Sequence, residues 1–224
     1  MKKRKNGGFT LLELLIVIAI IAILSVALVL VLNPAETLKK SRDAQRISDL
    51  STMKTALGLY MTSVSPAYLG GTADNNLCKA TPAAVWGVTP ATSRISYSLP
   101  SASITDATLD GGAVGVRSGV TAPSLTDGTG WVPVNFGSIA GGSPISNLPL
   151  DPINTVAVGT AVASSDLVYR YGCSVTPLAF EINAQLESDA YKVTDNKLTS
   201  DGGNNSNYFE TGTNLTILGT GSDF

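Results

Sequence analysis

The 224-residue chain has 15 lysines and arginines against 17 aspartates and glutamates, two cysteines and no histidine. Histidine is the most common general base and a common zinc ligand, so its absence makes hydrolytic and zinc-dependent catalysis hard to build, and we expect no enzyme. Residues 65–224 hold six basic and thirteen acidic residues, and this acidic part does not resemble a nucleic-acid-binding domain, which would show a basic patch.

The chain begins with a basic block, residues 2–5, that is soon followed by a long apolar run. Residues 14–32 carry no charge, and Ser25 is the only polar side chain among these 19 residues. As a helix, the run would span roughly 28 Å, close to the hydrocarbon thickness of a bilayer. We therefore predict one membrane-spanning helix over residues 9–32, with its N-terminus in the cytoplasm.

One acidic residue, Glu13, lies in the first turn of this apolar segment. An ionised carboxylate without a partner costs about 2.5–3.5 kcal/mol at the centre of a membrane helix, and less near the interface. Such a group indicates a function and predicts a partner. An ordinary secretory signal is disfavoured, because the run is long and no small-x-small cleavage site follows it.

Residues 2–24 read KKRKNGGFTLLELLIVIAIIAIL. They closely resemble the N-terminus of type IV prepilins and type II secretion pseudopilins. The resemblance implies that residues 1–8 are a leader, that prepilin peptidase cuts between Gly8 and Phe9, and that Phe9 is then N-methylated. It also implies that Glu13 neutralises the terminal ammonium of a neighbouring subunit when assembly platform proteins build the filament.

Pro34 follows the apolar run and predicts a kink. The helical pattern then resumes over residues 33–64 with one apolar stripe, formed by Ile47, Leu50, Met53, Leu57, Tyr60, Met61 and Val64. The remaining charges suggest a solvated helix face with intrahelical pairs at Glu36–Lys40, Lys39–Asp43 and Arg46–Asp49. Alternatively, these charges also set the register between packed subunits.

Residues 65–224 have the texture of an exported β-rich domain. Runs 167–171 and 178–182 alternate as half-buried strands and predict an antiparallel hairpin. Other β-like runs occur at 84–88, 95–99, 113–117, 131–136, 208–210 and 213–218. We predict an α+β, pilin-like fold in which a long N-terminal helix packs on an antiparallel sheet.

Two features of this domain suggest cross-links or ions. Cys78 and Cys173 are predicted to form a disulfide, because the domain lies outside the cytoplasm; the alternative is two buried free thiols. Asp189, Asp195 and Asp201 lie in an oxygen-rich stretch that suits a hard cation. Major type II pseudopilins carry calcium in C-terminal loops, so the resemblance suggests calcium here, although the same residues are ordinary turn formers. No other cofactor is expected.

The sequence therefore predicts a structural subunit of a type IV pilus-like filament. Before assembly, the subunit is inserted in the inner membrane as a single-pass protein with its domain outside the cytoplasm. It then polymerises into an extracellular or periplasmic filament. Two alternatives stay open: a major pseudopilin of type II secretion, and a membrane-tethered monomeric binding domain.

Overall fold

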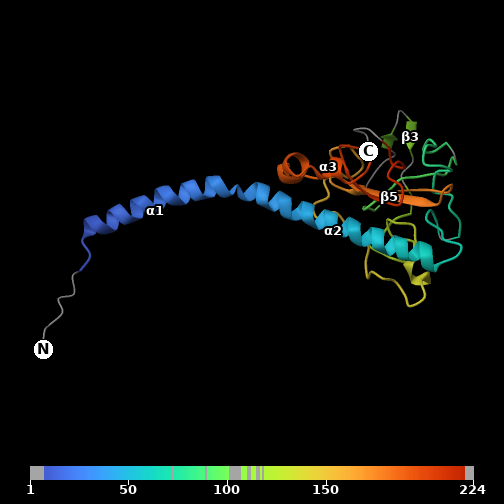
Figure 1. The fold of residues 1–224 in the computed structure, drawn as a ribbon, viewed down its shortest axis with the longest axis horizontal. Helices are drawn as coiled ribbons and strands as arrows, with labels where there is room; N and C mark the ends of the chain where they lie inside the picture. The colour runs from blue at the N-terminus through green and yellow to red at the C-terminus, as the bar shows by residue number, and fades with distance from the viewer. Residues whose placement is uncertain are drawn as a thin grey trace.

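The computed structural model describes residues 8–71, 73–88, 90–100, 107–109, 112–114, 117 and 119–219. Two successive helices, α1 (Leu11–Leu32) and α2 (Pro34–Ser63), form a long arm. Figure 1 shows that α1 lies clear of the rest of the protein, whereas α2 runs along one side of a globular domain. The predicted α+β, pilin-like fold is confirmed.

A single residue, Asn33, separates the two helices. Its backbone adopts the left-handed conformation, with φ 38° and ψ 71°, which ends α1. Its side-chain oxygen accepts a hydrogen bond from the Glu36 N–H at 3.4 Å and so caps α2. Pro34 occupies the first position of α2, where its missing N–H is not needed. The predicted kink is thus a one-residue break, after which the arm continues with a moderate change of direction (Figure 1).

The main sheet has four antiparallel strands in the order β1 (Ser96–Tyr97), β4 (Tyr169–Ser174), β5 (Ala179–Ala184) and β6 (Phe209–Gly212). The predicted β4–β5 hairpin is confirmed, and both strands extend further along the chain than the alternation suggested. A separate hairpin pairs β2 (Ala107–Leu109) with β3 (Gly112–Val114). Three short helical segments complete the described fold: η2 (Phe136–Ser138), the π-helix η3 (Ala190–Thr194) and α3 (Lys197–Ser200).

Several predicted strands are wrong. Runs 84–88, 131–136 and 213–218 form turns or irregular segments. Run 131–136 is instructive, because Trp131, Val132, Val134 and Phe136 are all fully buried. Its backbone pairs with a turn-rich loop, for example from the Trp131 N–H to the Pro123 carbonyl at 2.9 Å. The apolar pattern reflects burial, and among the described residues this run has only an isolated bridge, from Asn135 to Asp127, and no neighbouring strand. Runs 95–99 and 113–117 form strands in part, and residues 115 and 116 lie outside the described residues.

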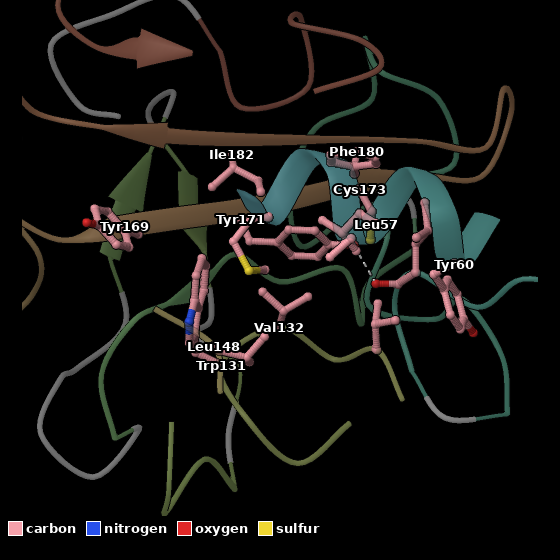
Figure 2. Packing of buried hydrophobic residues seen from close by; sticks show 14 of the residues in the cluster. Leu57, Tyr60, Trp131, Val132, Leu148, Tyr169, Tyr171, Cys173, Phe180 and Ile182 are labelled. Atoms are coloured by element: carbon pink, nitrogen blue, oxygen red, sulfur yellow. Dashed lines mark hydrogen bonds between the residues drawn. The ribbon is translucent and has the colours of Figure 1, made fainter. Parts of the chain in front are cut away.

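The sheet is buried on both faces, which corrects the prediction of half-buried strands. Every residue of β4 and β5 is buried. On one face, Leu57 and Tyr60 of α2 pack against Tyr171 and Phe180 of the sheet (Figure 2). This confirms the apolar stripe of the second helix. The other face is covered by a second cluster formed by Trp86, Ile95, Tyr97, Leu99, Val168, Ala179, Tyr208, Ile217 and Leu218.

A disulfide joins Cys78 to Cys173. Cys78 lies in the loop after α2, and Cys173 lies in β4, so the bond ties the far end of the helical arm to the sheet. The Tyr171 hydroxyl supports the same connection by donating a hydrogen bond to the Leu69 carbonyl at 2.8 Å.

Candidate assembly segment and its junction with the domain

Helix α1 presents an apolar surface on every side. Every residue of α1 whose side chain is described is exposed, and the stretch Leu11–Leu28 is long and apolar enough to cross a membrane. A helix of a soluble protein hides one apolar stripe and shows a polar face to water. A helix that is apolar all round instead requires lipid or other helices around it, and the globular domain supplies neither.

The residues before α1 are extended and accessible. Gly8, Phe9 and Thr10 precede the helix, and the Phe9 side chain is 80% exposed. No heavy atom lies within 4 Å of the position that a Cβ on Gly8 would take. The bond between Gly8 and Phe9 is therefore open to a peptidase. The rest of the predicted leader, residues 1–7, lies outside the described residues.

Glu13 lies in the first turn of α1. The Thr10 hydroxyl caps this turn by accepting a hydrogen bond from the Glu13 N–H at 3.2 Å. Among the described residues, no cation or hydrogen-bond donor reaches the Glu13 carboxylate. A partner for this carboxylate therefore comes from outside the described residues.

The family described as the prokaryotic N-terminal methylation motif matches residues 3–29. The match includes Gly8, Phe9, Glu13 and most of α1. Over these residues the chain is similar to type IV prepilins and pseudopilins. No curated protein and no solved structure matches the chain. The match ends before Asn33, so it does not extend to the globular domain.

Beyond α1, a buried cluster of charges fixes the domain to α2. We call Asp43, Arg46, Asp151 and Glu187 the charged joint. Arg46 is fully buried, and its Nε and Nη2 donate to the two Asp151 oxygens at 2.7 and 3.0 Å. Its Nη1 donates to Asp43 at 2.8 Å and to Glu187 at 2.6 Å. One guanidinium thus connects α2 to two segments that are distant in sequence.

The carboxylates of the joint are also held by other donors. Asp43 accepts hydrogen bonds from the Ser188 N–H and hydroxyl, each at 2.7 Å. Arg42 donates twice to Glu187, at 2.9 and 2.6 Å. Burial alone would raise the pKa of Glu187, but the hydrogen bonds from Arg42 and Arg46 outweigh it and hold that pKa below its ordinary value. Glu187 is therefore ionised at neutral pH.

The charged joint corrects the prediction of a solvated helix face at Asp43 and Arg46. None of the three predicted intrahelical pairs forms among these described residues; the pairs that do form are Lys39–Glu36 at 3.8 Å and Arg46–Asp43 at 2.8 Å. A signal was present in the sequence. The spacing of the buried stripe, continued back from Leu50 by four and then three residues, reaches Arg46 and Asp43. Both residues were nevertheless predicted to face solvent, because they are charged and because the partners that neutralise them lie 105 to 145 residues away.

The three C-terminal aspartates do not meet. Asp189 precedes η3, Asp195 forms an ion pair with Lys197 at 2.9 Å, and Asp201 accepts hydrogen bonds from the Gly203 and Glu210 N–H groups. Among the described residues, no group of three or more acidic, cysteine or histidine side chains could hold a metal ion. Calcium binding therefore stays a prediction for which these aspartates form no common ligand set.

A pair of buried acidic residues, Glu181 and Glu210, lies on the sheet face away from α2. One Glu181 oxygen accepts hydrogen bonds from the Ile217 and Leu218 N–H groups at 2.7 and 2.9 Å. Burial, together with the hydrogen bond and charge of Glu181, raises the pKa of Glu210 to about 9. Glu210 is thus protonated at neutral pH, which avoids a second negative charge beside Glu181. Glu187, only six residues after Glu181 in sequence, belongs instead to the charged joint.

Proposed function

We propose that this protein is a structural subunit of a type IV pilus-like filament. Before assembly, α1 spans the inner membrane and the domain stands outside the cytoplasm. Prepilin peptidase cuts after Gly8, Phe9 is N-methylated, and the mature subunit polymerises through α1. The observation that carries this proposal is the exposed, all-round apolar α1 beside the prepilin-type motif.

Polymerisation gives α1 and Glu13 the surroundings that a single chain lacks. In a filament, α1 helices from neighbouring subunits replace lipid around each apolar surface. Cleavage creates an ammonium group on Phe9, one helical turn before Glu13. An ammonium from the adjacent subunit supplies the partner that Glu13 lacks among the described residues. Such a pair matters most in a low-dielectric core, where either charge alone is costly.

The junction behind α1 supports the same role. A subunit drawn out of the membrane must transmit force from α1 to its domain. The charged joint, the apolar face of α2 and the Cys78–Cys173 bond attach the second half of the arm to the sheet along its whole length. The domain and α2 therefore move as one body.

The mature N-terminus provides the first test. We expect native protein to begin at Phe9 with one added methyl group, as measured by mass spectrometry of the N-terminal peptide. Shearing the cell envelope and identifying the filament subunit then separates a polymer from a tethered monomer. A chain that still begins at Met1, or that begins after Leu32, would rule out prepilin processing. A pseudopilus of type II secretion would have the same chemistry, and neighbouring genes for a retraction motor or a secretion channel distinguish the two.

A further inference from the structure

The part of the domain nearest to α1 is built from η3 and α3, in the orange-red segment of Figure 1. It is attached to the first turns of α2. The Ala190 N–H donates a hydrogen bond to the Glu36 carboxylate at 3.2 Å. The Lys40 ammonium lies 5.7 Å from the centre of the Tyr191 ring. We call residues 36–40 and 189–197 together the collar.

The depth of the collar follows from helix geometry. The 22 residues of α1 rise about 33 Å, which matches a hydrocarbon core of about 30 Å. Glu36 and Lys40 follow Leu32 by four and eight residues, or about 6 and 12 Å along the axis. Since headgroup layers add roughly 5–8 Å on each side of the core, a spanning α1 places Glu36 within the outer headgroup layer and Lys40 just beyond it, where a long lysine side chain reaches back to the headgroups.

The side chains of the collar suit that environment. Leu38 and Val193 are 60% and 72% exposed, and Tyr191 is a residue type favoured at membrane interfaces. Four lysines outnumber three carboxylates in the collar (Lys39, Lys40, Lys192 and Lys197 against Glu36, Asp189 and Asp195). The exported part is acidic overall, so the collar is an exception to it.

Two of the four lysines are available to an outside anion. Lys39 pairs with Glu36 and Lys197 pairs with Asp195. In the described part of the chain, no carboxylate forms an ion pair with Lys40 or Lys192. Both flank Tyr191, one by its contact with the ring and the other as its neighbour in sequence.

We propose that the collar is a membrane-contact surface that rests in the outer headgroup layer while α1 spans the bilayer. Leu38, Tyr191 and Val193 lie at the interface, and Lys40 and Lys192 face lipid phosphates. This contact orients the domain before assembly and is released when the subunit leaves the membrane. The inference rests on the proposed insertion of α1.

The test places a fluorescent reporter in the collar of the full chain. Val193→Trp is compared with Val175→Trp in vesicles of phosphatidylethanolamine and phosphatidylglycerol brominated near the headgroup. Val175 lies in the β4–β5 turn, where its N–H donates to the Lys79 carbonyl, beside the disulfide at the opposite end of α2. Trp86 and Trp131 are buried and give a constant background.

We expect bromine to quench most of the emission added at position 193 and to leave the emission added at position 175 unchanged. Adding Lys40→Glu and Lys192→Glu to the Val193→Trp chain should reduce the quenching in these anionic vesicles. Quenching that both lysine changes leave intact would overturn the phosphate contact. If neither or both tryptophans were quenched in chains that stay with the vesicles after an alkaline wash, the collar proposal would be wrong while insertion of α1 stood. Chains that the wash removes would instead contradict the proposed function.

Discussion

The two helices of the arm solve the same problem in opposite ways. Each contains a charge in an apolar setting: Glu13 in α1 and Arg46 in α2. Arg46 is neutralised within its own chain by three carboxylates, two of which come from segments more than 100 residues away. Glu13 has no such partner among the described residues. The comparison shows that α2 is part of a folded domain. In contrast, the apolar surface and the charge of α1 need partners outside that domain.

The largest effect should come from removing the charge that has no internal partner. Glu13→Ala should nearly abolish filament assembly, because each incoming Phe9 ammonium would enter an apolar core without a carboxylate. Breaking such a pair costs about 3–5 kcal/mol, and the cost recurs at every subunit. Membrane insertion should be unchanged or slightly improved. The measurement is the ratio of sheared filament to membrane-bound subunit.

Two further variants sharpen this result. Glu13→Gln should fail nearly as completely, since it keeps the shape and removes the charge. Ser25→Ala should assemble normally, because the Ser25 hydroxyl is already bonded to the Ile21 carbonyl at 2.7 Å within the helix. A Glu13→Ala chain with the parental filament ratio would end the idea that Glu13 acts between subunits.

The next effect concerns the disulfide that holds the far end of α2. Replacing both Cys78 and Cys173 by serine opens a cross-link between residues 95 positions apart. The chain-entropy model then gives a loss of about 4–5 kcal/mol in the free energy of unfolding. Urea unfolding of the detergent-solubilised chain measures it. The oxidised parent should show no reactive thiol after denaturation, and two reactive thiols would show that the bond does not form.

Removing the internally paired charge should destabilise the domain itself. Arg46→Met leaves the buried Asp43 and Asp151 and the partly buried Glu187 without their shared cation, and the free energy of unfolding should fall by about 3–5 kcal/mol. Arg42→Met is the matched control. It removes a neighbouring arginine whose pair with Glu187 is partly exposed, so the loss should be much smaller. Equal losses for the two variants would contradict the special position of Arg46.

The smallest effect, taken per pH unit, is a pH dependence within the domain. Glu210 has a folded pKa of about 9, against an ordinary value of 4.5. The folded state therefore binds more protons than the unfolded state between these two values, and stability should fall as pH rises through that window. The slope should be at most about 1.4 kcal/mol per pH unit.

Glu210→Gln tests this assignment, because glutamine imitates the neutral acid at every pH. The variant should unfold with a flatter dependence on pH than the parent between about pH 5 and pH 9, as followed by thermal melts. Burial also raises the pKa of Asp49 and of Asp201, so part of the slope should remain. A parental slope in the variant would place the responsible proton elsewhere.

Much of the molecule could be predicted because its signals are local. The unbroken apolar run predicts α1, since a helix satisfies its own backbone hydrogen bonds and needs no distant partner. The stripe of Leu50, Met53, Leu57 and Tyr60 predicts the buried face of α2, because residues three or four positions apart lie on the same side of a helix. The β4–β5 hairpin was accessible because its two strands are adjacent in sequence.

The predictions that were wrong concerned residues whose partners lie far away in the chain. Residues 131–136 were predicted as a strand, yet no strand in the described part of the chain pairs with them, and alternation cannot show what the neighbouring backbone is. Strands β4 and β5 were expected to show one face to water, but segments before and after them in sequence cover that face.

The sequence by itself determined the anchoring helix, the prepilin-type start and the candidate roles of Gly8, Phe9 and Glu13. Each of these depends on residues within a few turns of one another. Only the tertiary structure decided that Asp43 and Arg46 are buried and that Glu181 lies beside Glu210. The physical reason is that the preference of a charge for water or for the interior depends on which partners the fold brings to it. Those partners are set by chain topology and not by local spacing.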